Sequence, residues 1–337
     1  MLTSICFIMG LIVTHSVMAG PAPGPGGPPG GGGEEHVDLD PLNDFVFATW
    51  GSGDGNQAAS QVGCAASANT NRPSPQPGDE TLPYDFKVTN ASGGAGFYIY
   101  LDGNNANSGN SRLAIQFRHR DLMAGSGAEY LTHDVFDTHD HDGQFKNCMD
   151  GDNSQLEVSI NEAELAAVRA GNYTGSFSAE IRGGVNGTTT SAEDFQVSID
   201  VTDMVRISSM DNIDLGSWEG TGSINATETF CVYSNNDSAS YNISISSPNQ
   251  DGSANFYLVN SDTSAQVFYL LSFNDNVGGG AGSMVSDVAI SGTGANNSID
   301  CDGGDNAKLT VDIAETNLTN VPADAYGDTL TLVVSPE

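Results

Sequence analysis

The chain has 337 residues and a formal net charge of −33, because 43 Asp and Glu residues are set against only 10 Lys and Arg. A surface this acidic repels phosphate backbones and anionic lipids, which excludes nucleic acid as a partner and electrostatic attachment to a membrane. The charge fits either a solvated secreted surface or a saline habitat.

Residues 1–19 have the pattern of a secretory signal peptide. An apolar centre covers residues 5–13, and the small residues Val17 and Ala19 precede the expected cleavage site. The apolar run is shorter than the roughly 18 residues that a transmembrane helix needs, so we expect export without direct membrane insertion. Residues 20–42 begin with a run rich in Pro and Gly and predict a flexible linker.

From residue 43 onward the chain carries one pattern twice. Trp50 recurs 168 positions later, and Cys148 recurs 153 positions later together with the elements that follow it. An offset that changes only slowly along the chain indicates two copies of one fold. We therefore predict two tandem domains, the first over residues 43–203 and the second over residues 204–337.

Short runs of alternating apolar and polar residues fill both copies, separated by Gly, Asn and Asp. This pattern is typical of antiparallel sheets with one buried face. We predict an all-β chain with two tandem immunoglobulin-like β-sandwich domains. Residues 161–169 are the one stretch that predicts a helix. Examples of the alternation are Phe86/Val88, Leu113/Ile115/Phe117, Leu156/Val158/Ile160, Phe177/Ala179/Ile181, Leu309/Val311/Ile313 and Leu330/Leu332/Val334.

The two copies end differently. After its last shared strand, the first copy continues into a further alternating segment over residues 195–201, whereas the second has three residues after Val334. We therefore expect the C-terminal sandwich to lack its closing strand and to accept one from a neighbouring chain, because an open sheet edge leaves backbone groups unpaired. A solvated edge, or an N-terminal segment that folds back, is the alternative. The residues expected to line this donor-strand groove are Tyr326, Leu330, Leu332 and Val334.

Four cysteines fall two per repeat at matching positions. We predict the disulfides Cys64–Cys148 and Cys231–Cys301, which indicate an oxidising compartment. Metal binding by these thiols is not expected, because no two of them have C-x-x-C spacing. The acidic stretches at 148–153 and 301–306 resemble calcium loops but lack the full twelve-residue pattern, so turns are the favoured interpretation.

Histidine and aspartate are concentrated between residues 119 and 142. Imidazole and carboxylate at this density suit a divalent transition metal, with His133, His139 and His141 as candidate ligands. The spacing matches no closed tetrahedral site and no H-E-x-x-H helix is present, so a solvated loop is favoured and no cofactor is predicted. The run comprises His119, His133, Asp134, Asp137, His139, Asp140, His141 and Asp142.

Apolar residues are embedded in the same polar region. Loops on rigid sandwiches carry binding function and exposed apolar clusters mark contact sites, so we expect a ligand or surface contact here. Core packing is the alternative for each residue. The sequence contains no G-x-S-x-G nucleophile elbow, and we do not expect an enzyme. The candidate contact residues are Leu122, Met123, Tyr130, Leu131, Val135, Phe136 and Phe145.

The order and spacing of these motifs resemble spore coat protein U domains, the pilin-type domains of archaic chaperone–usher pili. Two stretches carry the resemblance most clearly: Phe-Cys-Val-Tyr-Ser-Asn at 230–235 and Tyr-Gly-Asp-Thr-Leu-Thr-Leu-Val-Val at 326–334. The Trp–Cys opening and the Cys-x-x-G-x-N element before an L-x-V-x-I strand add to it. The resemblance covers the second copy well and the first only through the repeat.

Two-domain members of this family are similar to pilus tip adhesins, in which a binding domain precedes a pilin domain that takes a donor strand. The resemblance therefore implies an adhesin-type sandwich over residues 43–203 and a pilin-type sandwich over residues 204–337. The resemblance implies a subunit exported through the periplasm to the cell surface, with adhesion and biofilm formation as its function. Its implied partners are a periplasmic pilus chaperone, an outer-membrane usher, an adjacent pilin subunit that donates a strand, and a host or abiotic surface. Residues 20–33 hold no alternating apolar stretch that could be donated, which agrees with a tip position. A structural pilus or spore-coat-like subunit without ligand binding is the alternative.

Overall fold

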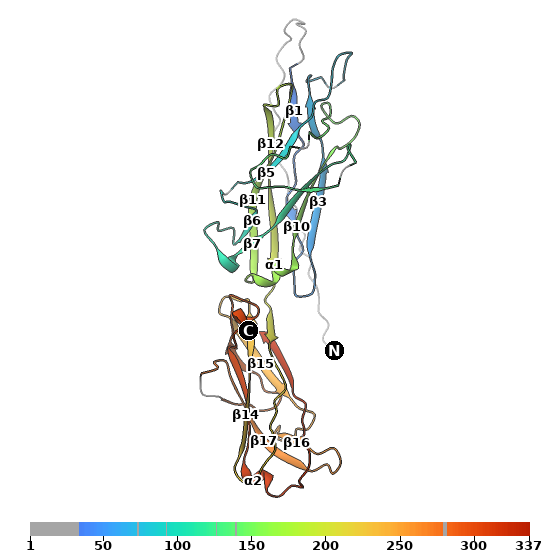
Figure 1. Cartoon of the computed structure of the whole chain (residues 1–337). Coiled ribbons are helices and arrows are strands. Elements are labelled where there is room, and N and C mark those ends of the chain that lie inside the picture. The colour runs from blue at the N-terminus through green and yellow to red at the C-terminus, as the bar shows by residue number, and fades with distance from the viewer. Residues whose placement is uncertain (1–33, 73, 92, 126, 139, 279–281) are drawn as a thin grey trace, which may run out of the picture. The chain divides into compact units, whose positions relative to one another are not determined.

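The computed structural model describes residues 34–337 except 73, 92, 126, 139 and 279–281. The predicted signal peptide and the first part of the predicted linker lie outside the described residues. The fold is all-β, as predicted, and its strands form two sets of sheets (Figure 1). Each set encloses a hydrophobic core of its own. We call the unit built from strands β1–β12 the first sandwich and the unit built from β13–β21 the second sandwich. Within the described ranges, no helix has the length and apolar character needed to cross a membrane.

The first sandwich places one sheet, in the order β3-β10-β8-β9, over a second sheet in which β12 lies between β2 and β11. Its core is aromatic: the ring of Phe117 meets Phe177 at 4.9 Å and Phe195 at 5.8 Å, both edge to face. Its elements are β1 (His36–Leu39), β2 (Phe45–Val46), β3 (Gln57–Gly63), β4 (Ala65–Ala68), β5 (Asp85–Asn90), β6 (Tyr98–Leu101), η1 (Gly109–Ser111), β7 (Arg112–Ala114), β8 (Gln116–Asp121), β9 (Glu129–Tyr130), β10 (Ser154–Ile160), α1 (Glu162–Ala167), β11 (Gly171–Gly183) and β12 (Thr189–Val201).

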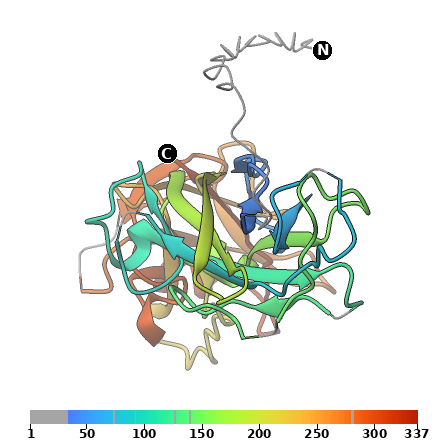
Figure 2. The same ribbon diagram turned by 90° about the horizontal axis from the view of Figure 1, so that it is seen from above.

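The long hairpin of β11 and β12 closes this sandwich. The two 13-residue strands pair along their whole length, from Gly171 opposite Val201 to Gly183 opposite Thr189. They are the light green and yellow-green arrows that run side by side in the view from above (Figure 2). The predicted helix is present as α1, and its Leu165 is fully buried in the core.

The range predicted as linker is corrected at its C-terminal end. Residues 36–39 form β1, which pairs antiparallel with β4, and Leu39 is only 3% exposed. The pairing satisfies the backbone groups of this segment while Leu39 joins the core. The short apolar alternation before Pro41 is therefore a strand of the sandwich.

The second sandwich repeats this plan with a different ending. One sheet has the order β13-β14-β20-β17-β16 and the other the order β19-β15-β21. Its elements are β13 (Val205–Ser208), β14 (Ile224–Ser234), β15 (Ser240–Ser246), β16 (Phe256–Val259), β17 (Gln266–Asn274), β18 (Gly282–Ser283), β19 (Ile290–Thr293), η2 (Cys301–Gly303), β20 (Ala307–Ile313), α2 (Glu315–Leu318) and β21 (Thr331–Pro336).

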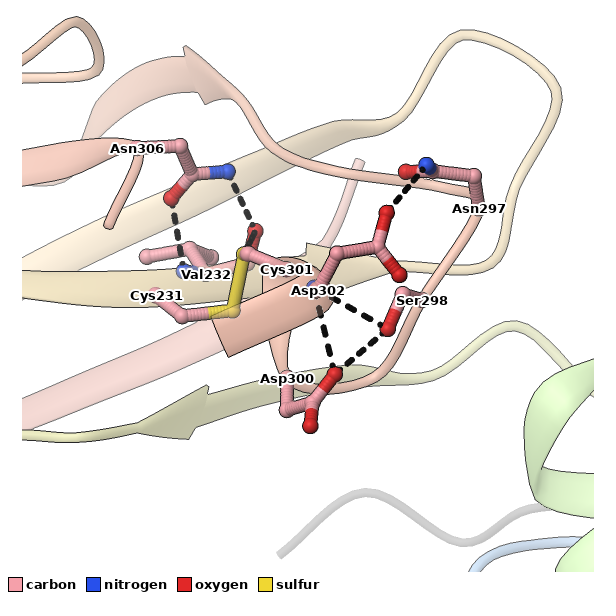
Figure 3. The surroundings of a disulfide bond; sticks show 8 residues. All are labelled: Cys231, Val232, Asn297, Ser298, Asp300, Cys301, Asp302 and Asn306. Atoms are coloured by element: carbon pink, nitrogen blue, oxygen red, sulfur yellow. Dashed lines mark hydrogen bonds between the residues drawn. A yellow bond between two sulfur atoms is a disulfide. The ribbon is translucent and has the colours of Figure 1, made fainter. Parts of the chain in front are cut away.

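Both predicted disulfides are present, and each is accompanied by an asparagine. The bond Cys64–Cys148 spans a Cα–Cα distance of 5.7 Å, and Cys231–Cys301 spans 5.9 Å. Asn306 accepts a hydrogen bond from the backbone N–H of Val232 at 2.8 Å and donates to its carbonyl at 2.9 Å (Figure 3). This side chain thus holds the residue that follows Cys231.

Asn153 makes the same two contacts in the first sandwich, with the N–H of Ala65 at 2.8 Å and its carbonyl at 3.0 Å. Near Asn306, Ser298 and Asp302 contact Asp300 within one turn (Figure 3). The structure thus agrees with the interpretation of both acidic stretches as turns.

Candidate functional site

The second sandwich contains an open groove where the first sandwich has β12. In the first sandwich β11 pairs with β5 on one edge and with β12 on the other. In the second, β21 pairs with β15, and among the described residues no strand pairs with its other edge. The registers correspond: Ala179 lies opposite Val88, and Leu332, 153 positions after Ala179, lies opposite Ile245. β21 is therefore the counterpart of β11 without its outer partner.

The other wall of the groove is the counterpart of β2. In the first sandwich β2 runs parallel to β12, with Phe45 beside Val197. The early repeat offset of 168 positions places Ile213 at the position of Phe45, and this part of the second sandwich belongs to no strand. The groove has a volume of about 670 Å³ and is lined by residues 210–216 on one side and 326–330 with Leu332 on the other, with Leu258, Tyr269, Leu309 and Val311 between them. Its walls are thus the two segments between which β12 lies in the first sandwich.

The apolar residues of β21 and the segment before it are incompletely covered. Tyr326, Leu330, Leu332 and Val334 are half-buried against the second core. Their counterparts in the first sandwich, Tyr173, Phe177, Ala179 and Ile181, are each 0% exposed. Three of the four predicted groove residues, Tyr326, Leu330 and Leu332, line the cavity, and Val334 lies further along β21.

One polar contact cluster fixes the groove wall. Asp328 accepts hydrogen bonds from the Tyr269 hydroxyl at 2.6 Å, from Ser247 Oγ at 2.8 Å and from Asn249 at 2.9 Å. Burial, and then the hydrogen bond to Asp328, raises the pKa of the Tyr269 phenol, so the phenol remains a donor at neutral pH. These bonds tie residue 328 to the floor of the groove and hold the segment before β21 in place.

The candidate contact residues of the first sandwich divide into exposed and packed groups. Met123, Tyr130 and Val135 are 50%, 68% and 51% exposed. Leu131 is half-buried and packs on the first core. Phe136 is half-buried between the Arg182 guanidinium, 4.3 Å from its ring centre, and the Lys87 ammonium at 4.6 Å. Leu122 and Phe145 are also half-buried.

The histidines of the acidic run lie in different environments. His139 lies outside the described residues. His133 accepts a hydrogen bond from the backbone N–H of Asn90 at 3.2 Å and its ring lies edge-on to Phe97. His141 is 7% exposed and lies against His119, which is 1% exposed. This part of the run is buried inside the sandwich and is not a solvated loop.

His119, Asp137 and His141 form a compact buried cluster. The Asp137 carboxylate accepts from His141 Nε2 at 2.8 Å, and its other oxygen accepts from the backbone N–H of Phe86 at 2.6 Å. Burial opposes ionisation of Asp137, but hydrogen bonds from both histidines and from Phe86 hold its pKa well below the usual range. Burial lowers the pKa of His119. At His141 burial is outweighed by the hydrogen bond to Asp137 together with the negative charges of nearby aspartates, which raise its pKa.

The sequence contains a signal for this cluster that spacing alone does not show. In β8 the buried residues are Phe117, His119 and Asp121, while the residues between them are more exposed. The period of two therefore assigns His119 and Asp121 to the core face, where a polar side chain needs a partner. His119 meets Asp137 and His141. Asp121 accepts hydrogen bonds from the backbone N–H groups of Met123, Ala124 and Asp142. None of these partners lies in a named strand, so their positions could not be predicted from periodicity.

No protein-family model matches the chain, and no curated protein matches it. Among solved structures, the CsuC–CsuE chaperone–tip adhesin pre-assembly complex from the archaic chaperone–usher Csu pili of Acinetobacter baumannii contains a chain that is 11% identical, with 89% of this chain and 99% of that chain covered and a TM-score of 0.46. CfaE, the adhesive subunit of CFA/I fimbria of enterotoxigenic Escherichia coli, is 13% identical, with 89% and 94% covered and a TM-score of 0.36. The CupB6 tip adhesin from Pseudomonas aeruginosa is 9% identical, with 89% and 93% covered and a TM-score of 0.28. These structural neighbours are adhesins of pili or fimbriae and a chaperone–adhesin complex.

Proposed function

We propose that this chain is the adhesive tip subunit of a chaperone–usher pilus and that it attaches cells to a host or abiotic surface and supports biofilm formation. The second sandwich, over residues 204–337, is the assembly domain. It receives a strand first from a periplasmic chaperone and then, at an outer-membrane usher, from the adjacent pilin. The first sandwich, over residues 43–203, is the adhesive domain exposed at the cell surface.

The observation that carries this proposal is the groove between residues 210–216 and the segment that leads into β21. Its walls correspond to β2 and β11, which in the first sandwich enclose β12. An incoming strand that follows β12 runs antiparallel to β21 and parallel to the segment around Ile213. Backbone pairing with β21 supplies affinity, and burial of alternate side chains supplies specificity.

The first sandwich also indicates which donor sequence fits. Along β12 every second residue faces the core: Phe195, Val197, Ile199 and Val201 are at most 3% exposed. We therefore expect a donor with four apolar residues at alternate positions. Full burial of each such side chain contributes about 1.5–3 kcal/mol, before the cost of ordering the donor.

The closed first sandwich is free to make a contact with another surface. Its edge beside β11 is filled internally by β12, while Met123, Tyr130 and Val135 present apolar side chains outside the core. Each can contribute contact energy by burial, and many tips on one cell add avidity. Leu131 and Phe136 support the fold of this region through their own packing.

The adhesive role is tested by replacing Met123, Tyr130 and Val135 together with Ser in the full chain and measuring attachment at constant piliation. Attachment should fall by at least tenfold. The matched control replaces Val46 and Val62, which are 75% and 53% exposed on other strands, and should attach normally. Equal attachment by both variants would remove the three residues from the contact surface.

Position in the fibre separates the adhesin from a structural subunit. Antibody to the first sandwich should label fibre ends if the chain is a tip subunit. Labelling along the whole fibre, with normal attachment by the triple variant, would favour the structural pilus or spore-coat-like alternative.

A further inference from the structure

The buried cluster of the first sandwich has the geometry of a metal site. His119 Nδ1 lies 3.2 Å from His141 Nε2 and 3.5 Å from Asp137 Oδ2, and the last two atoms are 2.8 Å apart. Ligand atoms of a tetrahedral zinc ion lie about 3.3 Å from one another when each bond is about 2.0–2.1 Å. The three atoms therefore form one face of a coordination tetrahedron with little adjustment.

Both tautomers of His119 fit this cluster. With its proton on Nδ1, His119 donates to Asp137 Oδ2, 3.5 Å away, in the ion-free form. When His119 carries its proton on Nε2, which lies 3.0 Å from Ser154 Oγ, its Nδ1 presents a lone pair. Asp137 Oδ2 presents another. One N–H of His141 can point at only one of these two acceptors, whereas one cation satisfies all three ligand atoms.

The surrounding groups orient the ligands as outer partners of a metal do. His119 Nε2 is also 3.5 Å from the Tyr84 hydroxyl, and His141 Nδ1 is 4.0 Å from Asp121 Oδ2. Asp137 uses Oδ1 for the N–H of Phe86, which leaves Oδ2 for the ion. The hydrogen bonds of His119 Nε2 with Ser154 and of Asp137 Oδ1 with Phe86 fix the orientation of these ligands, and such bonds raise metal affinity.

The backbone also holds the ligands in position. Tyr84 and His141 exchange two backbone hydrogen bonds, both 2.9 Å, and the N–H of Asp137 donates to the Phe86 carbonyl at 2.9 Å. His119 is fixed in β8, which pairs with β10. The site is therefore largely formed before any ion enters it.

We propose that His119, Asp137 and His141 bind one divalent transition-metal ion, Zn²⁺ by preference. Two imidazoles and one carboxylate form a borderline ligand set, and three protein ligands leave a fourth position for water. The His119, His141 and Asp137 side chains are 0%, 8% and 11% exposed, so the ion would be almost enclosed. It would fasten Asp137 and His141 to β8, close in sequence to Val135 and Phe136. The proposal does not depend on the function of the chain in a pilus.

The test measures binding of Zn²⁺ and Co²⁺ to the full secreted chain after chelator treatment. We expect one Zn²⁺ per chain by calorimetry and the visible absorption of four-coordinate Co²⁺. A hundredfold excess of Zn²⁺ over its Kd should raise Tm by about 5 °C or more. Asp137→Asn and His141→Gln should each weaken Zn²⁺ binding by at least tenfold.

His133→Gln is the matched control, because His133 lies in the same segment but contacts Asn90 instead of the cluster. It should bind Zn²⁺ like the unmodified chain. Circular dichroism establishes that the variants are folded. The Co²⁺ spectrum is measured on the unmodified chain, so this test does not depend on whether any variant folds. The proposal would be overturned if the unmodified chain gave no such Co²⁺ spectrum. It would also be overturned if folded Asp137→Asn bound Zn²⁺ as tightly as the unmodified chain, because the binding would then be adventitious and on the acidic surface.

Discussion

At the scale of single residues, one asparagine has the same task in both sandwiches. Asn153 and Asn306 each hold both backbone groups of the residue after the first cysteine of their repeat, Ala65 or Val232. The sequence shows the two asparagines at equivalent positions after a cysteine, and the turns there could be predicted. Their partners could not, because Asn306 and Val232 lie 74 positions apart and meet only when the strands pair.

Replacing Asn306 by Ala should lower the free energy of unfolding of the second sandwich by about 2 kcal/mol, because two hydrogen bonds at about 1 kcal/mol each are lost. Equilibrium urea unfolding of the intact chain measures this change. Asn297→Ala is the control, since the exposed Asn297 side chain donates a hydrogen bond to the Asp302 side chain and not to the backbone of β14, and it should leave the midpoint almost unchanged. Equal midpoints for the two variants would contradict a structural role for Asn306.

At the scale of secondary-structure elements, periodicity predicted the strands and the repeat predicted their correspondence. Leu156/Val158/Ile160 and Leu309/Val311/Ile313 are the inward faces of β10 and β20, as expected. β1 was assigned to the linker because four residues before a proline give too short a pattern. The buried cluster depends on Asp137 and His141, which belong to no periodic segment of the sequence, so their approach to His119 in β8 is set by tertiary packing.

The open edge predicts a difference in backbone protection between β21 and β11. β11 pairs with β12 on one edge and with β5 on the other. Among the described residues, β21 pairs with β15 on one edge and with no strand on the other. Peptides that cover residues 331–336 should therefore exchange amide hydrogen at least tenfold faster than peptides that cover residues 171–183 in the isolated chain. Hydrogen–deuterium exchange with mass spectrometry measures both in one sample. Equal protection would indicate that the outer edge of β21 is already covered.

At the scale of the whole molecule, attachment by charge and attachment by apolar contact should depend on salt in opposite ways. A net charge of −33 repels anionic surfaces, and salt screens that repulsion over a Debye length of about 10 Å at 0.1 M and about 3 Å at 1 M. If Met123, Tyr130 and Val135 make the contact, attachment should persist or strengthen as NaCl rises from about 0.05 M to about 0.5 M. Flow-cell retention of piliated cells measures this. A loss of attachment with salt would indicate a Coulombic contact instead.

We propose that the second sandwich takes a strand where the first has β12. The chain's own β12 segment can be used to test this. Pro336 corresponds to Gly183, the last residue of β11, through the offset of 153 positions. A full chain in which a copy of residues 184–201 follows Pro336 therefore carries a second β11–β12-like hairpin. The control carries the same extension with Ser at the copies of Phe195, Val197, Ile199 and Val201.

We would measure the thermal unfolding of both extended chains. Amide hydrogen exchange of residues 331–336 in the same chains reports on β21 itself. We expect the apolar extension to raise the unfolding temperature of the second sandwich by about 10 °C and to slow amide exchange in β21, and the serine extension to do neither. Equal melting and equal exchange in the two chains would contradict the claim that this groove accepts a strand.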